Sequence, residues 1–130
     1  MIVAVGLGLA GLGISGCSST ENGLASNVRK TDIAWLTTEL QNDGVFVRER
    51  GNAGRFIPST TSSRLVLDGQ EILDVYEFSE YGYAADQAYQ FAEQNPGSDV
   101  YLKQAIVVVR YSRRDTGLSQ TLNSLLGRTL

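Results

Sequence analysis

Hydrophobic residues follow two different patterns along this chain of 130 residues. Residues 2–16 contain only Ile, Val, Leu, Ala, Gly and one Ser, and the first charged residue after them is Glu21. From about residue 32 onward, apolar positions recur at helix or strand spacing and are separated by polar turns. The pattern predicts an apolar segment over 1–16, a small polar tether over 17–30, and one folded domain over 31–130.

Three segments have the apolar spacing of amphipathic α-helices. The first spans about 32–43, and Thr31 or Asp32 can cap its first turn. The second spans about 82–95, and the third ends at Gly127. We expect the apolar stripe of each helix to pack on a sheet; the stripes are Ile33, Leu36, Thr37 and Leu40, then Ala84, Ala85, Ala88, Phe91 and Ala92, then Leu118, Leu122, Leu125 and Leu126.

A β-hairpin is predicted where two apolar runs flank Asp68-Gly69. The runs cover 64–67 and 71–78, and Asp-Gly between such runs favours a two-residue type I′ turn. Both central residues of that turn have positive φ, which Asp tolerates and Gly adopts freely. We therefore expect Asp68 and Gly69 to be the two central residues.

Further strands are predicted on either side of this hairpin. Residues 45–50 read as a strand, followed by a loop over 55–63. A second hairpin joins 100–102 to 105–111, and 105–109 is apolar on both faces, as in a central strand. The element order is α-β-ββ-α-ββ-α. This order predicts the α+β fold class, with a single antiparallel sheet and helices packed on one face of it.

The apolar segment ends in Ile14-Ser15-Gly16-Cys17, which resembles the lipobox of bacterial lipoproteins. The segment is shorter than the roughly 20 apolar residues of a membrane span and has the length of a signal-peptide core. The resemblance implies that Cys17, the chain's only cysteine, is alkylated by a diacylglyceryl group. It also implies that maturation enzymes remove 1–16, and that lipid then holds Cys17 in a membrane.

Three features of this segment bear on that interpretation. A signal peptide opens with Lys or Arg, and Met1-Ile2-Val3 has neither, which a start codon upstream of Met1 would explain. An alternative is an uncleaved apolar anchor with an inert thiol. Residues 6–11 and 11–16 each spell GxGxxG, but the glycines lead into a polar stretch that cannot continue a helix. We therefore reject a dinucleotide site, which needs a helix starting at those glycines.

Composition restricts the classes of function. The chain has 14 acidic and 11 basic residues and a pI near 4.8, so no basic face supports nucleic-acid binding. Arg110, Arg113 and Arg114 form a small cluster that we interpret as a solvated strand end. The chain has no histidine, which removes the commonest general base and the commonest transition-metal ligand. We expect no metal site and no cofactor.

Two groups of side chains are candidates for chemistry or binding. Glu77 and Glu80, with Asp74 nearby, could act as an acid–base pair, although a solvated sheet edge is the simpler interpretation because spacing alone shows no cleft. The second group is aromatic and suits either a binding surface or ordinary packing. If a binding surface exists, we expect it at the strand-to-helix corner formed by Tyr76, Phe78, Tyr81 and Tyr83.

A second resemblance concerns the folded part. From Leu65 to Gly127 the chain resembles uncharacterised small bacterial lipoproteins, in a hairpin ending Val-Tyr-Glu-Phe, an Ala-rich helix, the strand Ile106-Val107-Val108-Val109 and a terminal Leu-Leu-Gly. That resemblance implies a location and a fold but no activity. Ser18 after the cysteine matches the family's outer-membrane sorting, so we expect a lipid-anchored envelope protein that faces the periplasm in a two-membrane cell.

We expect the domain to bind a protein or another envelope component without catalysis, because a tethered domain is concentrated near membrane partners. Two alternatives remain. One is a receptor for a small ligand or peptide, with an apolar pocket near the tyrosines. The other is an envelope hydrolase that uses carboxylates.

Overall fold

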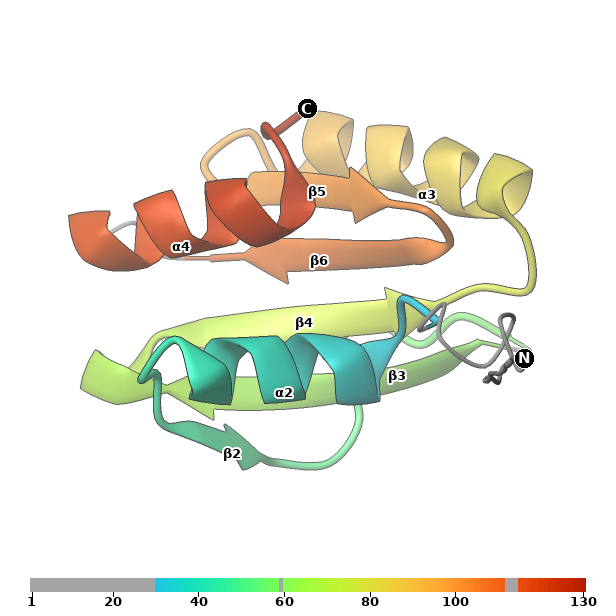
Figure 1. Cartoon of the computed structure of the whole chain (residues 1–130). Helices are drawn as coiled ribbons and strands as arrows, with labels where there is room; N and C mark the ends of the chain where they lie inside the picture. Colours follow the sequence, from blue (N-terminus) through green and yellow to red (C-terminus); the bar gives the residue numbers. More distant parts are fainter. Residues whose placement is uncertain (1–29, 59, 112–114) are drawn as a thin grey trace, which may run out of the picture. The chain divides into compact units, whose positions relative to one another are not determined.

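A five-stranded antiparallel sheet forms the middle layer of the folded part, 31–130 (Figure 1). The computed structural model describes residues 30–58, 60–111 and 115–130, and Thr31–Leu130 forms one compact unit. Neighbouring strands follow the order β2-β3-β4-β6-β5. Their bounds are Val47–Glu49 for β2, Thr61–Leu67 for β3, Ile72–Glu77 for β4, Asp99–Lys103 for β5 and Ile106–Arg110 for β6. The predicted α+β class and the predicted element order are confirmed.

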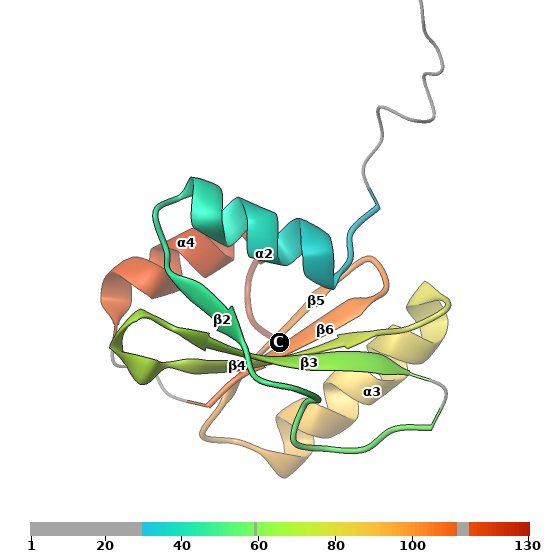
Figure 2. The same ribbon diagram turned by 90° about the horizontal axis from the view of Figure 1, so that it is seen from below.

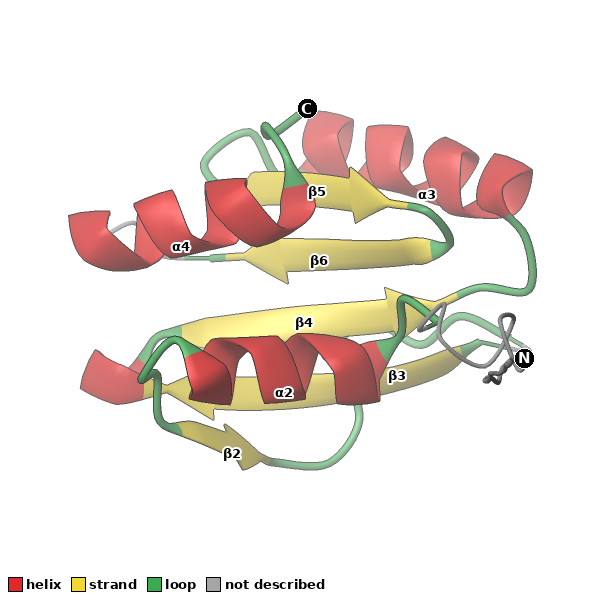
Figure 3. Cartoon of the chain, viewed as in Figure 1, coloured by secondary structure: helices red, strands yellow, loops and turns green. Residues whose placement is uncertain are grey.

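Helices cover both faces of this sheet, whereas the sequence predicted helices on one face. Helices α2 (Ile33–Asn42) and α4 (Thr116–Leu126) pack on one face, and α3 (Tyr81–Gln94) packs on the other (Figures 2 and 3). The reason lies in β6, where all five residues are buried and both faces therefore need an apolar cover. Helix α3 lies mainly over β5 and β6, at one side of its face.

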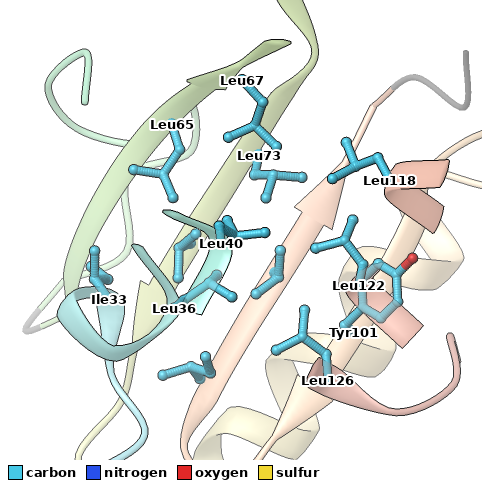
Figure 4. Close-up of a cluster of buried hydrophobic side chains, with 13 residues drawn as sticks. Ile33, Leu36, Leu40, Leu65, Leu67, Leu73, Tyr101, Leu118, Leu122 and Leu126 are labelled. Carbon is cyan, nitrogen blue, oxygen red and sulfur yellow. The ribbon is translucent and has the colours of Figure 1, made fainter. Parts of the chain in front are cut away.

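The larger core lies between the sheet and the α2/α4 pair (Figure 4). Side chains at alternate strand positions point into it, because successive residues of a strand face opposite sides. The predicted leucine stripe of the last helix supplies Leu118, Leu122 and Leu126, all buried. The first helix contributes the buried side chains Ile33, Leu36 and Leu40. The interpretation of both stripes as core is therefore confirmed.

The second core lies between the sheet and α3. Ala84 and Ala88 are fully buried, so their small side chains let the helix lie close to the strands. Phe91 belongs to the same core, and its ring lies 5.0 Å from that of Tyr76. Ile57, which belongs to the β2–β3 connection, also joins this core.

The predicted hairpin between β3 and β4 forms, but its turn is one residue longer than expected. The residues with positive φ are Gly69 and Gln70, rather than Asp68 and Gly69. A two-residue turn at Asp68-Gly69 would place Arg64 opposite Leu73. The three-residue turn 68–70 instead places Arg64 opposite Asp74. A shift of one residue changes every cross-strand pair, so this turn decides which charges meet.

Candidate functional site

The connection between β2 and β3 covers the part of the sheet that α3 leaves free. In Figure 2 this connection passes below β3, on the same side of the sheet as α3. Side chains of β3 and β4 that point to this side include Ser62, Asp74 and Tyr76. The 52–57 loop, which forms the middle of the connection, is bound to these three side chains.

Three consecutive backbone amides of the 52–57 loop donate to the sheet. Ala53 N donates to Ser62 Oγ at 3.1 Å, Gly54 N to Asp74 Oδ2 at 3.0 Å, and Arg55 N to Tyr76 OH at 3.1 Å. All three acceptors are side-chain oxygens from β3 or β4. Because each amide has its own fixed partner, the loop is held in one position on the sheet.

Asp74 is the centre of this arrangement and is fully buried. Arg64 donates to it twice, from Nε at 2.8 Å and from Nη2 at 2.9 Å, and Tyr111 OH donates at 2.8 Å. With the Gly54 amide, the carboxylate accepts four hydrogen bonds. We call Asp74 with its three partners Arg64, Gly54 and Tyr111 the Asp74 cluster. The cluster compensates the cost of removing a carboxylate from water.

The Asp74 cluster also changes the acid–base behaviour of its members. The hydrogen bond to Asp74 is the main cause that raises the pKa of Arg64 above its ordinary value. Burial, followed by the hydrogen bond to Asp74, raises the pKa of Tyr111. Burial likewise raises the pKa of Tyr76. These groups therefore keep the protonation states that the hydrogen bonds require throughout the neutral range.

Gly54 is the position where the loop backbone approaches the side chains of Arg64 and Asp74 most closely. A Cβ atom added there would lie 2.5 Å from Arg64 Nη2 and 3.2 Å from Asp74 Oδ2. Both distances are shorter than ordinary contacts with a Cβ. The absence of a side chain thus allows the loop backbone to reach Asp74.

A pocket of about 310 Å³ opens between the 52–57 loop and the first residues of β3. We call it the 52–62 pocket. Its volume is at the lower end of the range for small-ligand sites. Polar and apolar groups both line it, among them Asn52, Arg55, Phe56, Ile57, Thr61 and Tyr76.

Two exposed side chains of the loop stand at this pocket. Arg55 is exposed, and its guanidinium carbon lies 5.2 Å from the centre of the Phe91 ring, a cation–π contact. Phe56 is 86% exposed, the largest value among the large hydrophobic residues of the described chain. The pocket therefore combines one positive charge and one accessible aromatic ring.

Of the four aromatic residues predicted to form a surface, two are buried and two are exposed. Tyr76 and Phe78 are buried in the α3-side core, so neither side chain contributes to the surface at the predicted corner. Tyr76 instead lines the 52–62 pocket. Tyr83 packs edge-on against Phe78 with ring centres 5.1 Å apart, and it is 40% exposed. Tyr81 is exposed. Burial follows from the alternation of β4, which turns Tyr76 toward α3.

The predicted acidic candidates do not form a catalytic pair. Glu77 accepts a hydrogen bond from Ile33 N at 2.7 Å and so caps the start of α2. Glu80 is exposed and precedes α3 without a side-chain cap hydrogen bond. Asp74 points to the opposite face from Glu77, as alternation predicted, and is occupied by its own cluster. In the described residues, no group of three or more His, Cys, Asp or Glu could hold a metal ion.

Arg110 is not part of a solvated strand end, which corrects the interpretation from sequence. It is fully buried and donates to both carboxylate oxygens of Glu71, at 2.8 and 2.9 Å. It also donates to Ser119 Oγ at 2.6 Å and to Asp115 O at 2.9 Å. Arg110 thus joins the end of β6 to the start of α4. Its predicted neighbours Arg113 and Arg114 lie outside the described residues.

The predicted lipid-attachment residue Cys17 and the whole 1–16 segment also lie outside the described residues. Within the part of the chain that is described, no helix combines the length and the apolar character needed to cross a bilayer.

A smaller hollow of about 250 Å³ lies near the start of α4. It contains two carboxylates, and both have structural partners. Asp115 caps α4 by accepting from Leu118 N, and Asp68 accepts from Phe46 N. The 52–62 pocket is therefore the better candidate site.

Comparison with protein-family models, with curated proteins and with solved structures gave no match to this chain.

The sequence pattern predicted a loop over 55–63, but residues 61–63 belong to β3, and the pattern did not mark the loop as part of a site. The available signal was Asp74, an acidic residue inside an apolar strand, because a buried carboxylate requires donors from elsewhere. Finding its donors required the correct hairpin register, and the predicted turn gave a register one residue away.

Proposed function

We propose that this chain is the precursor of a lipid-anchored cell-envelope protein whose folded part, 31–130, is a non-catalytic binding module. The observation that carries the proposal is the position of Cys17, the only cysteine, at the end of an apolar run and before a polar stretch. Lipid on this residue would concentrate the domain near other membrane components.

The distribution of ionisable groups supports binding over catalysis. Asp74, Glu71 and Arg110 are buried and occupied by hydrogen-bonded partners within the domain. Glu77 caps a helix. A catalytic acid or base must reach a substrate, and these groups are committed to holding the fold.

Replacement of Cys17 tests the anchor. The full-length gene is expressed in a two-membrane bacterial host as wild type, as Cys17→Ala and as Ser19→Ala. We expect the wild type and Ser19→Ala in the membrane fraction, because the second variant retains the cysteine and the residues before it. We expect Cys17→Ala to lose the lipid and not to be cleaved at residue 17.

One result would contradict the proposed anchor at Cys17. If Cys17→Ala is processed and fractionates as the wild type does, the thiol does not carry the anchor, and the location assigned here is wrong. A Cys17→Ala chain that stays in the membrane fraction because it is not cleaved is distinguished from the mature wild type by its larger size, since residues 1–16 remain attached.

A second candidate function, a receptor for a small ligand or peptide, is favoured by the 52–62 pocket. The pocket is large enough for a small molecule, and the loop that forms it is fixed by three amide hydrogen bonds. A loop that is already ordered loses little conformational entropy on binding. This role is compatible with the anchor and is tested by ligand titration.

A further inference from the structure

We propose that the 52–62 pocket binds a small organic carboxylate, which Arg55 holds by its guanidinium group. The inference deepens the receptor role proposed above and does not depend on the lipid anchor. It is carried by the electrostatics of the pocket, by its free polar groups and by its fixed geometry.

Arg55 is a cation without a carboxylate partner among the described residues. The ion pairs of the described residues join Arg64 to Asp74 and Arg110 to Glu71. None of the described residues that line the pocket is Asp or Glu. A guanidinium has five N–H donors and binds a carboxylate through two parallel hydrogen bonds. The pocket therefore favours an anion of that shape.

Arg55 is held in place by two contacts, one through its side chain and one through its backbone. Its guanidinium carbon lies over the Phe91 ring, 5.2 Å from the ring centre, and its backbone amide donates to Tyr76 OH. Within the described ranges its guanidinium N–H groups make no hydrogen bond or ion pair, so they are available for a ligand. An arginine held in this way loses less side-chain entropy on binding than a freely moving one.

Other groups that line the pocket can contact the rest of the ligand. Asn52 and Thr61 line the pocket, and neither side chain makes a hydrogen bond to another described residue, so both can bind a polar ligand body. Phe56 is an accessible ring for an apolar portion. The volume of about 310 Å³ suits a ligand the size of a dipeptide or a single sugar.

Two sources of such a carboxylate fit this chemistry, the C-terminal end of a short peptide and an acidic sugar. Both present a carboxylate beside amide or hydroxyl groups. The 52–62 pocket has hydrogen-bonding groups for either one, so the experiment includes a probe for each.

The test is an NMR titration of the full ¹⁵N-labelled chain in detergent micelles. The probes are N-acetyl-alanyl-alanine and its C-terminal amide, then glucuronate and glucose, each up to about 10 mM, where even weak binding is detected. We expect one or both carboxylates to shift the amide signals of 52–57, and the matched neutral compounds not to shift them. Which carboxylate binds identifies the source.

Two variants make the result specific. Arg55→Gln removes the charge but keeps the backbone amide that donates to Tyr76, and we expect it to weaken binding about tenfold or more, the usual effect of losing a charge-assisted hydrogen bond. Arg128→Gln makes the same charge change outside the pocket and should bind as the wild type does. Unchanged spectra for the remaining core amides show that each variant is folded.

Three results would overturn the inference: no shift in 52–57 with either carboxylate, equal shifts with the neutral compounds, or unchanged affinity in Arg55→Gln. The Cys17→Ala chain is titrated in parallel and should bind as tightly as the wild type. A failure of the anchor therefore leaves the titration unchanged, and a failure of the pocket leaves the fractionation result unchanged.

Discussion

At the scale of single residues, each charged side chain that the described part of the domain buries against the sheet has several hydrogen-bonded partners. Asp74 accepts four hydrogen bonds, and Glu71 accepts two from Arg110 and one from Asp115 N. One such group lies on each face of the sheet. A buried ion pair is weak evidence for net stability, but removing one partner leaves an uncompensated charge. The consequence is that small changes near either group should have large effects.

Gly54 gives the sharpest test of this close packing. We expect Gly54→Ala to lower the free energy of unfolding by about 1–3 kcal/mol, because the added methyl group overlaps Arg64 and removes the loop amide from Asp74. Urea denaturation followed by circular dichroism measures the change.

Gly82→Ala is the matched control, since a Cβ at that position meets no atom within 4 Å. Gly82 lies in α3, so alanine should leave stability unchanged or raise it by up to about 1 kcal/mol. Equal destabilisation by the two substitutions would contradict the role given to Gly54.

Tyr111 makes the stability of the domain dependent on pH in the alkaline range. Burial and the bond to Asp74 raise its pKa in the folded state above the unfolded value of about 10. Its contribution is therefore complete below about pH 10 and is lost as the pH rises further. We expect the free energy of unfolding to fall above that pH, and to fall less steeply in Tyr111→Phe.

The measurement is urea denaturation at a series of pH values. Tyr81→Phe is the control, because Tyr81 is exposed, as Tyr111 partly is, but its hydroxyl makes no hydrogen bond to a described residue. Tyr111→Phe should also be less stable at pH 8, because the hydrogen bond to Asp74 is missing. Tyr76, whose pKa is also raised, accounts for the alkaline loss that remains. An unchanged slope in Tyr111→Phe would contradict this assignment.

Alternation predicted which face of the sheet a side chain points to, but not whether that face is covered. Alternation correctly put Asp74 and Tyr76 on one face of β4 and Glu77 on the other. It did not reveal that Tyr76 is buried, because whether a face is covered depends on α3 and on the 52–57 loop. Arg110 was placed in solvent for the same reason, since its partner Glu71 is 39 residues away in the chain.

At the scale of elements, local signals determined the helices and the hairpins. Asp32 caps α2 by accepting from Trp35 N at 2.8 Å, as the sequence indicated. The Asp68-Gly69 signal located the hairpin correctly, but a dipeptide does not distinguish a two-residue turn from a three-residue turn. The register, and with it the Arg64–Asp74 pair, therefore could not be derived from the turn alone.

The second cap of α2 comes from a distant strand and can be tested directly. We expect Glu77→Ala to destabilise the domain by about 1 kcal/mol, because Ile33 N loses its acceptor. Glu80→Ala should change stability by no more than about 0.5 kcal/mol, since Glu80 is exposed and makes no cap hydrogen bond.

The same two variants address the hydrolase alternative. Turnover of cell-wall glycan in cells that carry Glu77→Ala or Glu80→Ala should equal that of the wild type once protein levels are matched. A loss of turnover in a variant that remains folded would contradict the non-catalytic role and favour a carboxylate enzyme.

At the scale of the whole molecule, two parts of the chain have separate roles in this account. The folded part carries a fixed loop and a small pocket on the α3 side of its sheet. The N-terminal part supplies the proposed attachment through Cys17. The fold class followed from hydrophobic periodicity, whereas the pocket arises from a loop whose position depends on contacts between distant residues.

The most direct test of the central claim is the intact mass of the wild-type protein purified from the membrane fraction of a bacterial host. We predict a chain that begins at Cys17 and carries a diacylglyceryl group, with or without an additional acyl chain on its amino group. A protein that retains 1–16, begins at another residue, or has the mass of the unmodified polypeptide would contradict the claim.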